Sequence, residues 1–121
     1  MGSALNKIVE ARRRERERLI ELARSYVEQL SGRLPLVAAA VVGSVARGDF
    51  NVWSDIDVVV VADELPERTP DRMWLLVDGA PAGVQAVGFT PEEFRRARAR
   101  RNPLATEPAA IALVGEEFFA S

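Results

Sequence analysis

Two short stretches of the sequence carry side chains that could do chemistry. The first is Gly43-Ser44, which ends an apolar run, and the second is Asp55-Ile56-Asp57, which opens another. Residues two apart on a strand lie on one face, so we expect the carboxylates of Asp55 and Asp57 to point the same way. Two like charges on an otherwise apolar strand are costly unless a cation offsets them. Carboxylate oxygens are ligands that Mg²⁺ or Mn²⁺ prefers, so the pair predicts a site for one or two divalent cations.

Gly43 and Ser44 could supply an anion site beside these acids. A glycine after a buried strand lets a ligand approach the backbone closely. The turn is predicted to enter a helix, whose first N–H groups and positive dipole end favour an anion, and Ser44 adds a hydroxyl donor. Phosphate at Ser44 and metal at Asp55 and Asp57 would together bind a nucleoside triphosphate with magnesium. Such a site works by positioning and electrostatics, without a covalent intermediate.

Each stretch taken alone also has an ordinary structural explanation. A Gly-Ser pair is common in turns, and an Asp-x-Asp pair is often simply solvated. The combination is more specific, because Ser44 and Asp55 lie eleven positions apart and each flanks a predicted buried strand.

The composition narrows the available chemistry. The 121 residues include no cysteine and no histidine. This excludes disulfides, thiolate nucleophiles, cysteine or histidine metal sites and a serine–histidine–aspartate triad. The remaining groups are carboxylates, hydroxyls, amides, backbone N–H groups, one lysine and fifteen arginines. The formal net charge of −2 gives no global attraction to nucleic acid.

Length and hydropathy predict one domain over residues 1–121. The longest apolar run, 36–43, is too short to cross a membrane. The N-terminus also lacks the charged-then-apolar order of a signal peptide. We therefore expect a cytoplasmic protein.

The elements that must position the two stretches are helices and short strands. A long helix is predicted over 4–31, followed by a core over 36–101 and a C-terminal extension over 103–121. Apolar runs predict buried strands over 36–42 and 55–61, and a third strand is predicted over 84–89. Helices are predicted over 44–49, 71–77, 91–101 and 108–114, and a short closing strand over 117–120. The clearest helix start is Thr90-Pro91-Glu92-Glu93, where Thr90 caps and Glu93 completes a capping box.

Several other segments have two interpretations. The charged stretch 10–18 of the long helix is either a solvated face, which we favour, or a surface for a partner. Trp53 either stacks on a base or packs against the protein, and we expect packing. Trp74 is expected in the core. The arginines at 95–101 are expected to form a solvated helix end, with binding of RNA or an acidic partner as the alternative.

The motif resembles a known family. Gly-Ser-x-Ala-Arg-Gly at 43–48, followed by Ser-Asp-Ile-Asp-Val-Val-Val at 54–60, is similar to the minimal nucleotidyltransferase domain of the DNA polymerase beta-like superfamily. The similarity is sharp over 42–61, looser through 90–94, and leaves the N-terminal helix unexplained. It implies an α/β (α+β) fold: a small mixed twisted sheet flanked by helices.

The resemblance also implies roles for individual residues. Gly43 and Ser44 would hold the triphosphate, and Asp55 and Asp57 would bind Mg²⁺ or Mn²⁺ as the catalytic acids. Arg47 matches the arginine of the motif, and would either contact phosphate or pack the loop.

One position departs from the family's pattern. Catalytic members carry a third carboxylate on a later strand, and counting back from Thr90 puts that position near Gln85. A glutamine coordinates through its carbonyl oxygen but cannot accept a proton at neutral pH. Either another acid such as Asp49 or Asp78 takes the role, or catalysis is weak or absent, or the strand is misplaced.

The reaction implied is transfer of a nucleoside monophosphate from a nucleoside triphosphate to a hydroxyl. Proteins resembling this one often act as the antitoxin of a helical HEPN-type toxin partner. The alternative is a catalytically weak or inactive module that binds a nucleotide or a partner, with the site altered at Gln85. A third possibility is an RNA-binding module that uses the arginines. A homo-oligomer is compatible with each of these.

Overall fold

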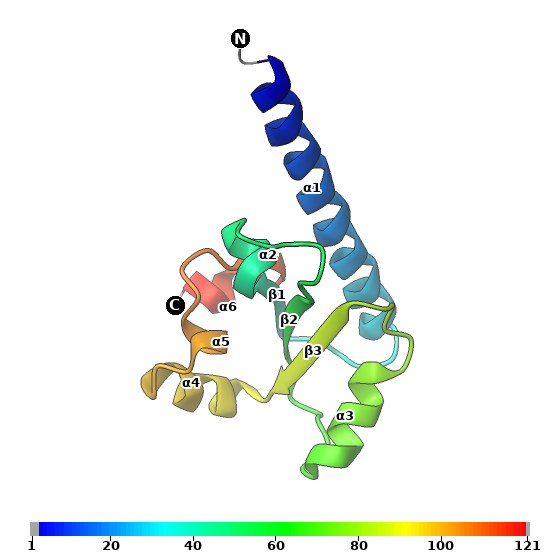
Figure 1. Cartoon of the computed structure of the whole chain (residues 1–121). Coiled ribbons are helices and arrows are strands. Elements are labelled where there is room, and N and C mark those ends of the chain that lie inside the picture. Colours follow the sequence, from blue (N-terminus) through cyan, green and yellow to red (C-terminus); the bar gives the residue numbers. More distant parts are fainter. Residues whose placement is uncertain (1–2, 121) are drawn as a thin grey trace.

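A computed structural model describes residues 3–120 and contains a four-stranded sheet in the order β3-β2-β1-β4. The strands are β1 (Ala38–Val42), β2 (Ile56–Val61), β3 (Val84–Phe89) and β4 (Ile111–Val114). β2 and β3 are parallel, whereas β1 is antiparallel to both β2 and β4 (Figure 1). The twisted mixed sheet confirms the predicted fold class.

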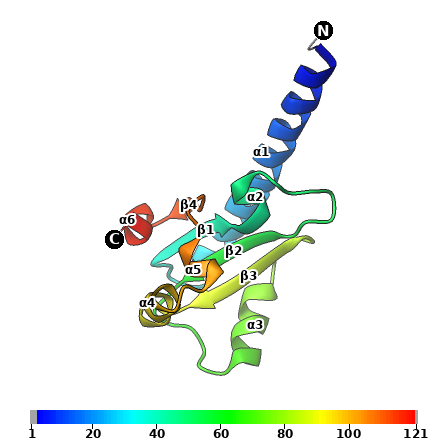
Figure 2. The same cartoon turned by 60° about the vertical axis from the view of Figure 1, so that its left-hand side comes forward.

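Helices flank both faces of this sheet (Figure 2). In the described part of the chain they are α1 (Ser3–Ser31), α2 (Gly43–Arg47), α3 (Thr69–Val77), α4 (Pro91–Ala99), α5 (Pro103–Thr106) and α6 (Glu116–Ala120). One hydrophobic cluster joins the sheet to α1 and α3, and a second joins its other face to α4, α5 and α6. None of these helices is long and apolar enough to span a membrane.

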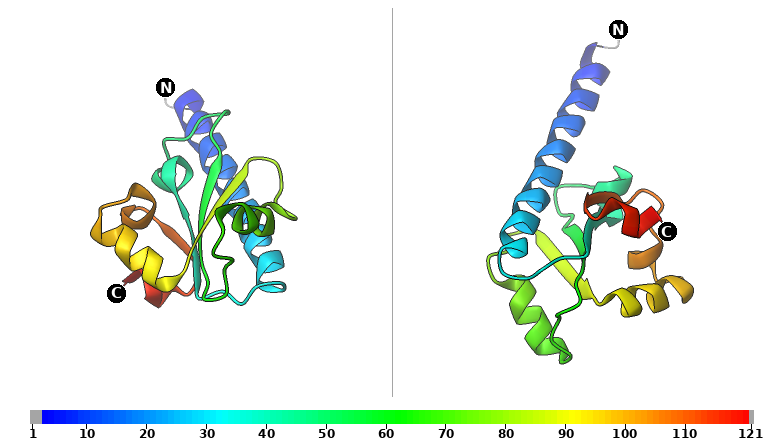
Figure 3. Two further views of the ribbon diagram at one scale, coloured as in Figure 1. Left: turned by 90° about the horizontal axis from the view of Figure 1, so that it is seen from below. Right: turned by 180° about the vertical axis from the view of Figure 1, so that it is seen from behind.

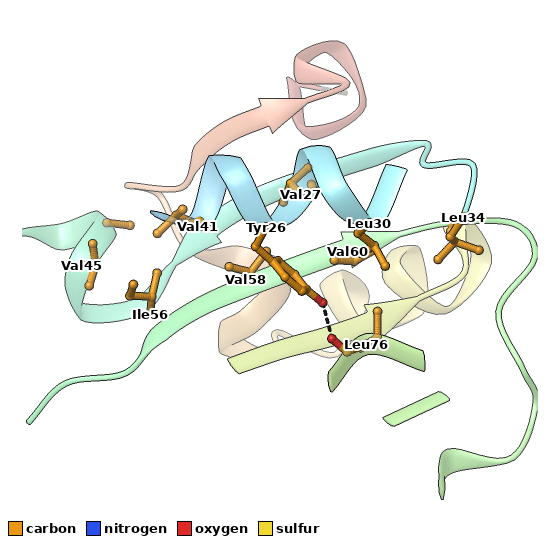
Figure 4. Close-up of a cluster of buried hydrophobic side chains, with 14 of the residues drawn as sticks. Tyr26, Val27, Leu30, Leu34, Val41, Val45, Ile56, Val58, Val60 and Leu76 are labelled. Carbon is orange, nitrogen blue, oxygen red and sulfur yellow. Dashed lines mark hydrogen bonds between the residues drawn. The ribbon is translucent and has the colours of Figure 1, made fainter. Parts of the chain in front are cut away.

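The two central strands are buried on both faces, which explains their uninterrupted apolar runs. Ile56, Val58 and Val60 of β2 pack on the α1 side of the sheet, and Figure 4 shows Val58 and Val60 beside Tyr26. The alternate residues Val59 and Val61 pack on the other face with the α4 side chains. The same alternation turns the side chain of Asp57 toward the α4 and α5 side.

The C-terminal half of α1 is fixed in the core, whereas its N-terminal half extends beyond the sheet (Figures 1 and 3). Ala23, Tyr26, Val27 and Leu30 are buried. The Tyr26 hydroxyl donates a hydrogen bond of 2.6 Å to the carbonyl oxygen of Leu76. The helix predicted over 4–31 is therefore confirmed to within a residue.

The predicted strands and the α4 start agree with the structure. The strand over 84–89 has the predicted bounds, and those over 36–42 and 55–61 begin one or two residues later. Thr90 and Glu93 form the expected capping box, in which the Glu93 amide donates to Thr90 Oγ1 and the Thr90 amide donates to Glu93. The helix ends at Ala99 rather than 101.

The C-terminal predictions were wrong. The segment predicted as a helix over 108–114 contains β4, and the strand predicted over 117–120 is helix α6. The short helix α5 was not predicted. Alanine favours a helix locally, but β1 has a free edge, and pairing with that edge overrides the local preference. Gly115, with φ +64°, ends β4 where a Cβ would overlap the Val37 carbonyl oxygen.

Both tryptophan predictions were also wrong. Trp74 is 75% exposed, because Leu76 supplies the buried side of α3. Trp53 is 89% exposed in the loop before β2 and does not pack. The helix expected over 71–77 begins earlier, at Thr69, with Pro70 in its first turn, where proline is tolerated.

Candidate functional site

The site forms where β1 ends, because the chain turns there directly into α2 and faces the start of β2. Gly43 adopts φ +73°, a conformation that favours glycine. A Cβ at this position would collide with the carboxylate of Asp57. Glycine therefore suits the backbone conformation here, and an added Cβ would force the Asp57 carboxylate to move.

Asp57 is a half-buried acid without a partner. Burial raises its pKa, the negative charge of Asp55 raises it further, and Arg47 opposes both effects. Within residues 3–120 we find no hydrogen bond or ion pair to either carboxylate. Asp55 is exposed and directly precedes β2. The two acids thus lie close enough to repel each other, and the positive charge of Arg47 offsets this only in part, without an ion pair to Asp57.

A pocket of 570 Å³ opens beside Asp57. One wall holds Gly43, Ser44, Arg47 and Asp57, so four of the predicted site residues come together. Asp55 is not among the residues that line it. The opposite wall comes from the segment after α4, which sequence analysis did not connect with the site; its lining residues are Pro103, Leu104, Thr106, Glu107 and Pro108.

Arg47 ties these two walls together. Its Nη1 lies 2.7 Å from Glu107 Oε1, and its Nε lies 3.2 Å from Asp49 Oδ2. The Glu107 side chain is only 7% exposed, so this ion pair is partly shielded from water. These contacts correspond to the loop-packing alternative for Arg47, while the side chain still lines the pocket.

Gln85 lies beside Asp57 in the sheet. The parallel register of β2 and β3 pairs Asp57 with Gln85, so the two side chains share a face. The other acids considered for the third position are engaged elsewhere: Asp49 pairs with Arg47, and Asp78 pairs with Arg33. The described part of the chain contains no group of three or more acidic side chains that could hold a metal.

Three residues near the site escaped the sequence analysis because their contacts are long-range. Glu107 meets Arg47 across 60 positions. Arg12 and Arg16 of α1 reach α2 and the loop after it across about 30 to 40 positions. The only local signal was the density of charge over 10–18, which does not distinguish these two arginines from their neighbours.

The nucleotidyltransferase domain family matches this sequence over residues 20–115. A search of curated proteins finds no match. Among solved structures, a candidate nucleotidyltransferase from Sulfolobus solfataricus shares the fold, with a TM-score of 0.64 over 84% of each chain and 23% sequence identity. At that identity the structural similarity supports the fold alone. Because the family match spans most of the sequence and covers the Gly43 turn and Asp57 together, this chain belongs to the nucleotidyltransferase domain family.

Proposed function

We propose that this protein binds a divalent cation and a nucleoside triphosphate between α2 and the start of β2, and transfers the nucleoside monophosphate to a hydroxyl. The observation that carries the proposal is the Asp57 carboxylate, which is half-buried, unpartnered and next to a second acid. A divalent cation would offset that charge. Asp55 and Asp57 are the proposed ligands of Mg²⁺ or Mn²⁺ and the proposed catalytic acids.

The acid pair Asp55 and Asp57 fits a cation that keeps part of its water shell. Mg²⁺ is typically held by one or two carboxylates together with phosphate oxygens and water, which suits a site with two protein carboxylates. When bound, the cation would neutralise charge on the phosphates. Since no group of three acidic side chains among the described residues could hold a metal, the proposal uses two carboxylates only.

Gly43 and Ser44 are proposed to hold the phosphates. The first turn of α2 has no side-chain cap, so its N–H groups are available to a ligand, and the Ser44 hydroxyl adds a donor. Arg47 lines the same pocket and contributes positive charge. A phosphate near these groups would lie beside the acid pair, as a metal-bridged triphosphate requires.

Gln85 supports the second candidate function, a nucleotide-binding or partner-binding module with weak or no transfer activity. It occupies the position next to Asp57 on the neighbouring strand and cannot take a proton from an attacking hydroxyl. Binding depends mainly on the Gly43-Ser44 turn and the two acids. We therefore expect binding to persist and transfer to be slow.

The acceptor hydroxyl is proposed to belong to a separate macromolecule. The resemblance to minimal nucleotidyltransferases favours a small helical HEPN-type toxin as that partner, with this chain as its antitoxin. The alternative partner is RNA, bound by the arginines at 95–101. The exposed apolar residues of α1 and α3 are compatible with a protein partner.

Calorimetric titration with each nucleoside triphosphate, with and without Mg²⁺, tests the binding step. We expect magnesium-dependent binding by the wild type, loss of binding in Asp57→Asn, and unchanged binding in Asp63→Asn, an exposed acid that serves as the control. Equal affinity in Asp57→Asn would contradict the proposed ligand role.

Transfer of labelled nucleotide onto a co-purified partner separates the enzyme from the binding module. A general base is typically worth about 10²–10⁴-fold, so Gln85→Asp should transfer faster than the wild type by a readily detected factor. Rapid wild-type transfer without a gain in Gln85→Asp would show that another group completes the site.

A further inference from the structure

Arg16 of α1 is bound to the end of α2. Its Nε donates a hydrogen bond of 2.9 Å to the carbonyl oxygen of Val45, and its Nη2 donates one of 2.7 Å to that of Ala46. The two bonds use the Nε–Nη2 edge of one guanidinium, which fixes its orientation relative to the helix.

Arg12, one turn earlier on α1, holds the segment that follows. Its Nη2 donates to the carbonyl oxygens of Phe50 at 2.8 Å and Gly48 at 3.1 Å. Its guanidinium also lies 4.6 Å from the centre of the Phe50 ring. Two consecutive turns of α1 thus hold four carbonyl oxygens, all between residues 45 and 50.

These bonds matter because α2 is short. A helix of five residues does not form by itself in water, and its last carbonyls lack partners within the helix. Positive groups at a helix C-terminus also stabilise its dipole. Arg16 therefore supplies hydrogen-bond donors and positive charge at the C-terminal end of α2. Gly43 and Ser44 lie at the other end of the same helix.

The two arginines come from a firmly held element. α1 runs for 29 residues without proline or glycine, and Tyr26, Val27 and Leu30 anchor its second half in the core. Arg12 and Arg16 are therefore presented by a continuous helix rather than by a mobile loop. The right-hand view of Figure 3 shows α1 running beside α2.

We propose that Arg12 and Arg16 are positioning residues for the candidate nucleotide site. By holding the last carbonyls of α2 and those of the segment that follows it, they keep the Gly43-Ser44 turn in the orientation that faces Asp57. The nucleotide part of this proposal rests on the proposed function, whereas the effect on α2 does not. The charged stretch of α1 then has a third role, besides the solvated face and the partner surface considered from the sequence: it holds α2 in place.

Amide hydrogen exchange followed by NMR tests the effect on α2 directly. The amides of Gly48 and Asp49 both donate to the carbonyl oxygen of Ser44, at 2.8 and 3.1 Å. Their exchange rates therefore report whether the hydrogen bonds at the C-terminal end of α2 are formed. The variants are Arg16→Gln, Arg16→Lys and Arg12→Gln/Arg16→Gln. The matched control is Arg14→Gln, which removes the same charge from the same exposed half of α1.

We expect exchange of these two amides to accelerate by about tenfold or more in Arg16→Gln and further in the double variant. Arg16→Lys should restore part of the protection, because an ammonium group can donate to one carbonyl but lacks the planar fork. The amide of Val27 in the anchored half of α1 should exchange at the wild-type rate in all variants. Arg14→Gln should match the wild type throughout.

Titration of the same variants with magnesium and a nucleoside triphosphate tests the consequence for the site. Affinity should fall by about tenfold in Arg16→Gln and stay at the wild-type value in Arg14→Gln. Unchanged exchange at Gly48 and Asp49 in the double variant would overturn the proposal, as would a lack of protection in the wild type. Wild-type protein that is protected at α2 but binds no nucleotide would instead refute the proposed function and leave the positioning of α2 by the arginines supported.

Discussion

The candidate site depends on a missing side chain as much as on those present. Because Gly43 has no side chain, the Asp57 carboxylate can contact the N-terminal end of α2. The turn proposed to bind phosphate and the acid are therefore in direct contact. Asp57 meanwhile remains without a partner although it is half-buried. The arrangement is therefore costly for the metal-free protein, which is typical of residues kept for binding rather than for folding.

Asp57→Asn should make the metal-free protein slightly more stable at pH 7. Burial and Asp55 raise the pKa of Asp57, so the charged form is less favourable in the folded state than in the unfolded chain. Removing the charge removes that cost. Urea unfolding without divalent cations measures the change, with the exposed Asp63→Asn as the control. A large loss of stability would instead mean that buried hydrogen bonds hold Asp57 in a structural role.

Gly43→Ala should destabilise the protein by about 1–3 kcal/mol, because it combines backbone strain with a collision against Asp57. In an Asp57→Ala background only the backbone strain remains, so the cost of Gly43→Ala should be smaller there. Gly48→Ala is the matched control, since Gly48 has φ +89° but no neighbour near an added Cβ. Equal costs of Gly43→Ala in both backgrounds, measured by urea unfolding, would contradict the close approach.

At the scale of elements, the sequence predicted secondary structure best where the residues of the element itself determine whether it is a helix or a strand. The apolar runs of β1 and β2 and the β-branched, aromatic-ended run of β3 lie within the strands themselves, and the capping box that starts α4 is local. β4 is different, because its state depends on the free edge of β1, about 70 residues earlier. The far wall of the pocket and the arginine contacts to α2 were missed for the same reason: each depends on a partner distant in sequence.

The capping box of α4 gives an element-scale prediction. Thr90→Ala removes the acceptor for the Glu93 amide at the helix start and should cost about 1 kcal/mol. Thr69→Ala should cost much less, because the N-cap of α3 is Arg68 and makes no side-chain capping bond. Thermal unfolding of the two variants side by side measures the difference. Equal losses of stability would mean that the capping bond of the Thr90 hydroxyl adds nothing to the difference in helix propensity between threonine and alanine.

At the scale of the whole molecule, Tyr26 joins elements from both halves of the sequence. It lies in α1, packs against β2 and donates its hydroxyl proton to the Leu76 carbonyl at the end of α3 (Figure 4). A buried phenol with such a bond strongly favours its neutral form. Burial accordingly raises the pKa of Tyr26 to about 12, although the positive charge of Arg33 opposes the shift.

The whole fold should therefore lose stability in alkali through this one group. The neutral phenol contributes fully below the ordinary tyrosine pKa of 10.0, and its contribution is lost as the pH rises from there toward about 12. The chain has one tyrosine and one lysine, and arginine stays protonated, so few other groups titrate in this interval. Tyr26→Phe should be less stable than the wild type at pH 8, because the Leu76 carbonyl loses its donor, by about 1–3 kcal/mol. The stability of Tyr26→Phe should then fall less between pH 10 and 12, so the two plots of unfolding free energy against pH converge. Urea unfolding across this pH range measures both plots. Parallel plots would show that Tyr26 ionises as freely in the folded protein as in the unfolded chain.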